Sequence, residues 1–232
     1  MSLLLEVIVQ SVEDALAAEA GGADRLEVVR AIERDGLTPP AELVRAIVSA
    51  SRLPLRVMVR ETDSFTVAGA QELTALQRAL AAFADIGVDG AVLGFAKGGA
   101  PDLQTTTAVL SAAPTLPVTF HRAFDSLGDP LAAIDALQSL PQVDRILTSG
   151  GSGDWAARCR RFAQYTARAG SRLTILAGGG VDADGVQMLA STGCVREAHV
   201  GRAACEPPRP GAPVAAERVK SLRVLAGQPH RK

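Results

Sequence analysis

The chain has 232 residues, which suits one large domain and leaves little sequence for a second. Hydrophobic residues make up 47% and aromatic residues 3%, a composition that excludes disorder and predicts a core of small and branched side chains. The 24 Lys and Arg nearly balance the 25 Asp and Glu, so the net charge of −1 argues against nucleic-acid or membrane-surface partners, which favour a basic excess.

Short apolar segments alternate with amphipathic segments along the whole chain. Eight segments have the length and composition of strands: Leu4–Val9, Arg25–Val29, Leu55–Val59, Ala91–Phe95, Val118–Phe120, Arg145–Leu147, Leu173–Leu176 and Ala198–Val200. Helical spacing lies between them, as in Val12–Ala20, Pro40–Ser49, Gln71–Ile86, Pro130–Leu140 and Trp155–Ala169, and a closing helix is expected near Ala215–Ala226. This alternation predicts a parallel sheet with right-handed crossovers. Eight units average about 29 residues (232/8), near the ~30 residues of one βαβ unit.

An internal repeat favours a closed barrel. A turn with Asp precedes an apolar strand in Gly22–Glu27, Gly87–Val92 and Gln142–Leu147, and Gly193–Arg196 is a degenerate fourth copy. These copies precede the even-numbered strands, whereas the third and fifth strands open with Leu-Pro, an alternation typical of paired βα units. An open, doubly wound sheet is the alternative, although no G-x-G-x-x-G turn follows the first strand. We predict a single-domain (β/α)8 TIM barrel over residues 1–232.

Polar side chains gather at the expected strand ends, where barrel enzymes carry their catalytic groups. Glu6 and Glu27 interrupt the first two apolar strands, His121 ends the fifth, and His199 lies in the eighth beside Glu197. We expect these two acids and two histidines, Glu6, Glu27, His121 and His199, to converge in the barrel mouth as catalytic candidates. Buried carboxylates need counter-ions, and Arg60 and Arg122 are the candidates for that role.

A purely structural role is the alternative for these residues. Glu6 and Glu27 could be the ends of salt bridges between strands, and a single buried histidine is more often a hydrogen-bonded core residue than a catalyst. The turn residues Asp24, Asp89 and Asp144 are expected at the opposite, stabilising end of the barrel, and we assign them no function.

Glycine-rich loops follow the sixth, seventh and eighth strands. Barrels often bind phosphate with the loops after strands 7 and 8, where backbone N–H groups face the anion. We therefore expect an anionic ligand at these loops, with His121 placed to move a proton. The ligand-binding candidates are Arg60, Arg122, Ser149, Gly178, Gly179, Gly180, Gly201 and Arg202. The alternative is that the glycines only shape tight turns.

Metal, nucleophile and export signals are weak. Cys159, Cys194 and Cys205 form no CxxC motif and are expected to be reduced thiols in a cytoplasmic protein. His121 and His199 with Glu6 or Glu27 could hold a divalent ion, but no short-range ligand spacing supports this. The N-terminus lacks the basic segment of a signal peptide, and no apolar run approaches the ~20 residues of a membrane span.

Seven segments in order, between about residues 4 and 204, resemble the CutC family: Leu5–Val7, Gly22–Glu27, Asp35–Pro39, Val118–Asp125, Arg145–Gly150, Gly178–Val181 and Glu197–His199. The part from Thr119 to Asp125 is the most specific. The resemblance implies a (β/α)8 barrel, a cytoplasmic location and a role in copper homeostasis, with copper as the suggested metal. No reaction is established for the family.

The chain departs from the family pattern at three places. Family members proposed to bind copper carry cysteines just after the first two strand glutamates, where this chain has Ile8 and Val29, and Cu(I) prefers thiolate or thioether ligands. The third-strand motif keeps Arg60 and Phe65 but is shortened and loses its second Arg, and His-x-Ser-Ala becomes His199–Arg202. These departures favour a role other than Cu(I) binding for the polar cluster.

Three functions stay open from the sequence. The first is an acid/base enzyme that acts on a small phosphorylated or carboxylated substrate. The second is a metal-handling protein, and the third is a non-catalytic ligand-binding barrel such as a sensor. In each case the expected partner is a small molecule, with no nucleic acid and no membrane. A homo-oligomer stays open as well.

Overall fold

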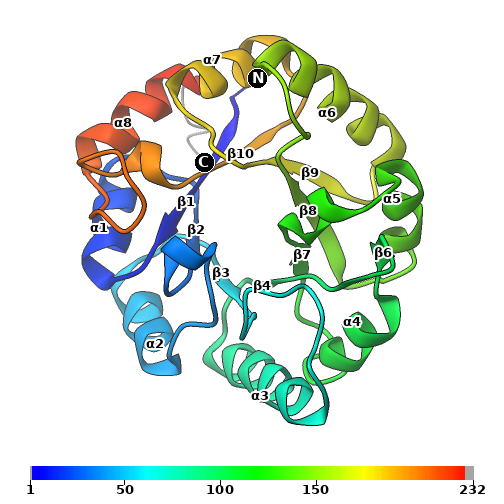
Figure 1. Ribbon diagram of the computed structural model, residues 1–232. Coiled ribbons are helices and arrows are strands. Elements are labelled where there is room, and N and C mark those ends of the chain that lie inside the picture. Colours follow the sequence, from blue (N-terminus) through cyan, green and yellow to red (C-terminus); the bar gives the residue numbers. More distant parts are fainter. Residues whose placement is uncertain (1, 228–232) are drawn as a thin grey trace.

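Eight parallel strands pair side by side until the last meets the first, in the order β1-β10-β9-β8-β7-β4-β3-β2 (Figure 1). This is a computed structural model, and it describes residues 2–227. The barrel strands are β1 (Leu4–Val9), β2 (Arg25–Val28), β3 (Leu55–Met58), β4 (Gly90–Leu93), β7 (Val118–Phe120), β8 (Val143–Thr148), β9 (Thr174–Ala177) and β10 (Glu197–Val200). The predicted TIM barrel is confirmed, and the open sheet is excluded because the order closes on itself.

A ring of helices covers the outside of the barrel (Figure 1). They are α1 (Val12–Ala20), α2 (Ala41–Ala50), α3 (Ala70–Ile86), α4 (Leu103–Leu110), α5 (Pro130–Gln138), α6 (Trp155–Ala169), α7 (Ala183–Thr192) and α8 (Ala216–Leu225). Four of them begin at an aspartate whose carboxylate accepts a hydrogen bond from the first turn, which fixes the start of the helix: Asp102, Asp129, Asp154 and Asp182.

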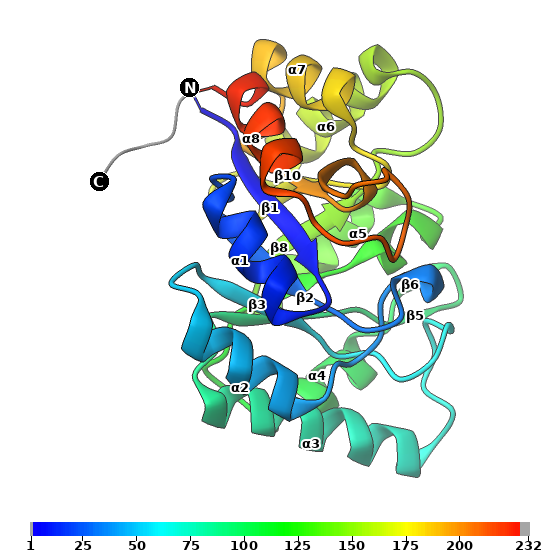
Figure 2. The same ribbon diagram turned by 90° about the vertical axis from the view of Figure 1, so that its left-hand side faces the viewer.

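The final helix closes the molecule as expected. The Leu3 N–H donates to the Ala226 carbonyl at 2.9 Å, and α8 packs between α1 and α7 (Figure 2). A short hairpin that the sequence did not predict, β5 (Ala96–Lys97) with β6 (Ala100–Pro101), follows β4. No helix among residues 2–227 is long and apolar enough to cross a membrane.

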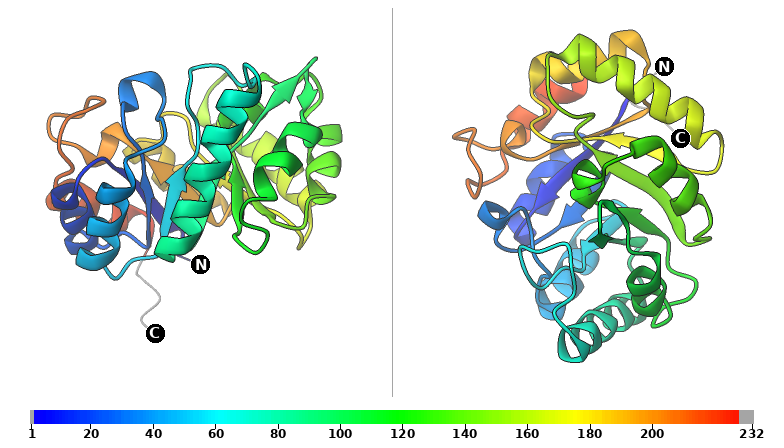
Figure 3. Two further views of the ribbon diagram at one scale, coloured as in Figure 1. Left: turned by 90° about the horizontal axis from the view of Figure 1, so that it is seen from below. Right: turned by 45° about the vertical axis from the view of Figure 1, so that its right-hand side comes forward.

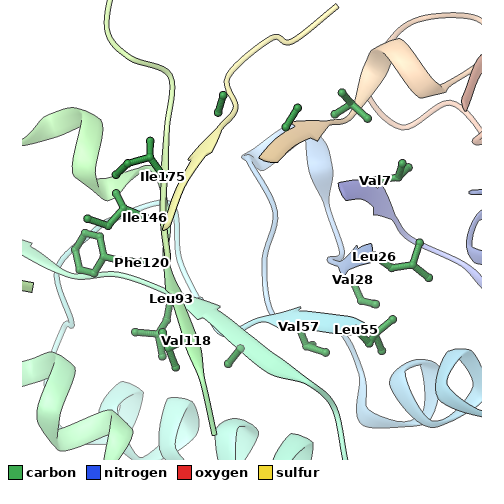
Figure 4. Close-up of a cluster of buried hydrophobic side chains, with 14 of the residues drawn as sticks. Val7, Leu26, Val28, Leu55, Val57, Leu93, Val118, Phe120, Ile146 and Ile175 are labelled. Carbon is green, nitrogen blue, oxygen red and sulfur yellow. The ribbon is translucent and has the colours of Figure 1, made fainter. Parts of the chain in front are cut away.

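The apolar core lies between the barrel and its helices. Side chains alternate between the two faces of a strand, and those on the outward face of each strand form this core. In β1 these are Leu5, Val7 and Val9, which are fully buried in the main hydrophobic cluster. Figure 4 shows part of this cluster, with Phe120 and Ile146 on neighbouring strands. The helices are therefore held to the barrel by burial of small and branched side chains, as the composition predicts.

At the end where the strands begin, which we call the lower end, the inside of the barrel is charged rather than filled with branched apolar side chains. Here lie three carboxylates and three guanidiniums in one chain of ion pairs, which runs Glu6, Arg25, Glu197, Arg145, Asp144, Arg56 and ends on the Thr119 hydroxyl. The four central pairs have N···O distances of 2.5–2.9 Å. A complete network of this kind satisfies charges that would be very costly if they were buried alone.

The predicted turn aspartates take structural roles in the repeat. The carboxylate of Asp24 accepts from the Leu5 N–H, and that of Asp89 accepts from the Leu55 N–H, each at 2.8 Å. Both bonds tie the turn before an even strand to the odd strand beside it. The third copy differs, because Asp144 belongs to the charged network instead.

Candidate functional site

A cavity of about 490 Å³ opens at the end of the barrel where the strands finish. The loops that follow β2 and β10 rise around this end of the molecule (Figure 3). Nine of the twelve predicted site residues line the cavity: Glu27, Arg60, His121, Arg122, Gly179, Gly180, His199, Gly201 and Arg202. Glu6, Ser149 and Gly178 are not among its lining residues.

Two side chains of this cavity leave buried polar atoms without partners. In the described part of the chain, Glu27 Oε2 and Arg60 Nε are the buried side-chain oxygen and nitrogen atoms that have no hydrogen bond. Glu27 is 2% exposed and Arg60 is 6% exposed. Buried polar groups are nearly always hydrogen-bonded, so one unsatisfied acceptor and one unsatisfied donor that border the same cavity point to a polar ligand there.

Glu6 lies beneath the cavity and belongs to the ion-pair network. One of its oxygens pairs with the Arg25 guanidinium, and the other is 2.8 Å from His199 Nδ1. Burial alone would raise the pKa of Glu6, but Arg25 and His199 together hold this pKa far below its ordinary value. Glu6 is therefore a permanent carboxylate that orients the His199 ring.

Arg60 and Arg122 are not the counter-ions of the buried glutamates, so this prediction is wrong. Arg60 donates to the Asp63 carbonyl at 2.7 Å, and Arg122 pairs with Asp125 at 3.1 Å. Arg25, which was not among the predicted site residues, neutralises Glu6, because Glu6 and Arg25 are register partners in the paired strands β1 and β2.

Glu27 is the least satisfied acid in the site. Its Oε2 lies 3.4 Å from His199 Nδ1, which is already engaged by Glu6. Burial raises the pKa of Glu27 to about 7, with Glu6 adding to the rise, although His199 opposes it. Burial likewise opposes the charged form of His199, but Glu27 and Glu6 raise the pKa of this imidazole. Glu27 can therefore hold or release a proton near neutral pH.

His121 is a fixed, neutral imidazole. Its Nδ1 accepts the Ala123 N–H at 3.1 Å, which leaves Nε2 as the protonated nitrogen. Its ring packs against Phe65 with centroids 5.4 Å apart, and Gly94 makes room for it, because a Cβ there would lie 2.8 Å from Nδ1. Burial, helped by Arg60, lowers the pKa of His121 to about 3. The expected proton carrier is thus a hydrogen-bond donor instead.

The loops after β9 and β10 present backbone amides at the cavity. Gly179 and Gly180 have φ of 71° and 78°, a left-handed conformation that favours glycine. A Cβ on Gly179 would lie 2.7 Å from Ser149 Cβ, so only glycine fits there. Within residues 2–227 the amides of Gly179, Gly180 and Gly201 donate no hydrogen bond, and the Arg202 guanidinium lies beside Gly180. Free amides next to a cation are suited to an anion.

Two residues absent from the predicted site hold these loops in place. Asp125 accepts from the Thr148 hydroxyl at 2.6 Å and from the Ser149 N–H at 3.1 Å. Arg158 donates to the Ser149 carbonyl at 2.6 Å and to the Gly178 carbonyl at 2.7 Å while stacking on Trp155. Ser149 and Gly178 therefore serve the loop framework. Asp125 belongs to the Thr119–Asp125 segment, the most specific part of the family resemblance, whereas nothing in the sequence indicated a role for Arg158.

The donor set does not fit a metal ion. Donor atoms of Glu6, Glu27 and His199 lie within 4.8 Å of one another, but both oxygens of Glu6 and Nδ1 of His199 are already used, and Arg25 adds a cation. Cu(I) in particular prefers thiolates. Ile8 and Val29 lie together in a small apolar cluster instead, with Met58, Val92 and Ile32.

Known proteins resemble this chain over most of its length. The CutC family model matches residues 3–204. A CutC family protein of Xanthomonas campestris pv. campestris is 36% identical over 84% of this chain and 81% of its own. The copper homeostasis protein cutC homolog of Homo sapiens is 30% identical over 84% and 72%. The crystal structure of the putative copper homeostasis protein CutC from Streptococcus agalactiae has a TM-score of 0.77 at 25% identity, covering 86% of this chain and 98% of that one.

Proposed function

Because the chain belongs to the CutC family, we propose that it is a cytoplasmic barrel protein with a part in the copper homeostasis for which its relatives are named, and that its mouth binds a small anionic organic ligand. The ligand class is a phosphorylated or carboxylated compound. It would lie with its anionic group at the Gly179–Gly180 and Gly201–Arg202 loops and its polar body over Glu27 and Arg60.

The pair of unsatisfied buried atoms carries this proposal. A protein that left Glu27 Oε2 and Arg60 Nε unpaired for no purpose would lose stability, since each orphaned group costs ~1–3 kcal/mol. A hydroxyl group of a ligand can donate to the first, and a hydroxyl or carbonyl oxygen of the ligand can accept from the second.

Charge at the rim supports the anionic class. Arg122 and Arg202 line the cavity and are exposed, so they can approach a ligand from solvent. Arg122 is ion-paired with Asp125, whereas Arg202 has no ion pair among the described residues. The overall net charge is only −1, so attraction of an anion depends on these local groups.

A thermal-shift screen tests the proposal. Inorganic phosphate, small sugar phosphates and small carboxylates are added to the wild-type protein, and at least one is expected to raise its melting temperature. The stabilisation should fall for Arg202→Gln and should persist for Arg209→Gln, an exposed arginine of the same loop that does not line the cavity. The proposal is wrong if no compound stabilises the wild type, or if both variants respond equally.

A further inference from the structure

Glu27 has the geometry of a base that acts on a ligand rather than on the protein. It comes from β2, it borders the cavity, and its Oε2 has no hydrogen-bond partner among residues 2–227. His199 Nδ1 lies 3.4 Å from this oxygen, but the same nitrogen is already hydrogen-bonded to Glu6. A buried carboxylate with an open lone pair is a far stronger base than a solvated one, because water no longer stabilises its charge.

His121 faces the same cavity from β7, on the other side of β3 and β4 in the barrel order. Its Nδ1 is fixed by the Ala123 N–H, and within the described chain its Nε2–H has no acceptor. A neutral imidazole locked in this tautomer can donate to a carbonyl oxygen and stabilise the negative charge that develops there. A carboxylate base opposite a neutral imidazole donor is a known arrangement for abstracting a proton next to a carbonyl group.

We propose that this site catalyses a 1,2-proton transfer on a small phosphorylated or carboxylated α-hydroxycarbonyl compound, with Glu27 as the base and His121 as the hydrogen-bond donor. The inference rests on the proposed function, because the anionic group must be held at the glycine loops to place the reacting carbon. The reaction class is the interconversion of a hydroxyaldehyde and a hydroxyketone.

The step balances without a co-reactant. The Glu27 carboxylate removes the proton from the hydroxyl-bearing carbon, and the C–H electron pair becomes the C=C bond of an enediolate. The carbonyl π pair moves to oxygen, where the His121 Nε2–H stabilises it. The Glu27 carboxylic acid then returns the proton to the neighbouring carbon. The hydroxyl proton passes from one oxygen of the enediolate to the other, and His121 keeps its own proton throughout as the hydrogen-bond donor.

His199, Glu6 and Arg25 are positioning residues in this scheme. Arg25 anchors Glu6, Glu6 orients the His199 ring, and His199 lies 3.4 Å from Glu27. A change at His199 should therefore shift the pH at which Glu27 works rather than abolish the reaction. The readout is the pH profile of the exchange rate in His199→Gln, compared with the wild type.

Proton exchange in D2O is the test, because it detects abstraction whatever the product. Sugar phosphates of three to six carbons that bind in the thermal-shift screen are incubated with the protein, and loss of the proton on the hydroxyl-bearing carbon is followed by NMR. We expect exchange above the protein-free rate for at least one compound. Glu27→Gln should reduce it by ~10²-fold or more while binding persists. Arg209→Gln, outside the cavity, should leave it unchanged.

Two substitutions separate the roles of the His121 nitrogens. His121→Asn can keep an acceptor for the Ala123 N–H but removes the Nε2 donor, and exchange should fall ~10²–10³-fold. His121→Gln places an amide near the Nε2 position and should retain more of the rate. Binding without exchange in the wild type overturns the catalytic inference alone, as does full exchange in Glu27→Gln. Absence of binding overturns the proposed function and the inference with it.

Discussion

The Glu27 carboxyl makes the stability of the protein depend on pH in a direction opposite to that of an ordinary ion-paired acid. Its pKa rises from an ordinary value of 4.5 to about 7 because it is buried, with Glu6 adding to the rise. Between these values the unfolded chain has lost the proton and the folded chain keeps it. The stabilisation that is complete below pH 4.5 is therefore lost as the pH rises through about 7.

Glu27→Gln should remove this dependence, since glutamine has the same shape and no charge. At pH 8 the free energy of unfolding of the variant is expected to exceed that of the wild type by up to about 3 kcal/mol. Urea denaturation at several pH values measures this. The charged or titratable neighbours that also act on Glu27 stay in place: His199, Glu6, Arg25 and Arg56.

Glu6→Gln is the matched control, because it removes a buried glutamate whose pKa is lowered rather than raised. Arg25 and His199 overcome burial and hold the pKa of Glu6 below its ordinary value, so its contribution is present at neutral pH and is lost only in acid. This variant should be less stable than the wild type at pH 8. Equal effects of the two substitutions would contradict the assignment of one proton-holding and one ion-paired glutamate.

At the same scale, the sequence indicated which polar residues gather at the mouth but not their depth. Both glutamates interrupt an apolar strand, yet the register pairs Glu6 with Arg25 and Ile8 with Glu27. Glu27 therefore stands two residues nearer the mouth, and only Glu27 reaches the cavity. The stagger between strands depends on the closed barrel and has no local sequence signal. The Asp-Arg pairs in two copies of the repeat, at Asp24 and Asp144, were the available sign of the charged network.

At the scale of elements, strands and helices followed from the alternation of apolar and amphipathic segments, because each strand had to bury one face against a helix. The β5–β6 hairpin escaped prediction, since each strand has only two residues and too little pattern to be seen. Its turn does carry a sequence signal, the pair Gly98-Gly99, because hairpin turns favour glycine and both residues have positive φ. The sequence also did not indicate that the loops after β8 and β9 are linked. The link is Arg158 of α6, which hydrogen-bonds to both loops, and such long-range contacts leave no local sequence pattern.

Arg158→Met should loosen these two loops. Its guanidinium satisfies the carbonyls of Ser149 and Gly178, and methionine would leave both without this donor. We expect a loss of ~1–3 kcal/mol in the free energy of unfolding, and weaker stabilisation by any ligand found in the phosphate screen. Arg160→Met, on the exposed face of α6, is the control for a lost charge on this helix. Unchanged ligand affinity in Arg158→Met would show that the loop amides do not need this brace.

Over the whole molecule, the barrel divides into layers along its axis. The lower interior holds the chain of ion pairs, in which three positive and three negative side chains compensate one another. Glu27 and His199 lie where this network meets the cavity, so the charges below them act on the ligand site through Glu6 and Arg25. A small apolar cluster around Met58 and Val92 covers part of the remaining interior. The network thus forms a polar floor beneath the cavity in which we propose that an organic ligand binds.

The same layering predicts weak or no specific Cu(I) binding at the mouth. The two positions where thiols are expected in copper-binding relatives, Ile8 and Val29, are apolar and pack into that cluster. The cysteines of this chain lie elsewhere: Cys159 and Cys194 line a groove beside α6 and α7, and the Cys205 thiol contacts the Gly201 carbonyl. Competition with a Cu(I) chelator should detect no tight stoichiometric site in the wild type.

Installing the missing thiols gives this prediction a positive control. The double variant Ile8→Cys, Val29→Cys places two soft ligands in one cluster, and we expect it to compete for Cu(I) where the wild type does not. The triple variant Cys159→Ser, Cys194→Ser, Cys205→Ser removes the native thiols and should abolish whatever weak binding the wild type shows. Tight stoichiometric binding that survives in the triple variant would mean that the carboxylates and imidazoles of the mouth hold copper. In that case the ion-paired floor, which occupies both oxygens of Glu6, would have to open to admit the metal.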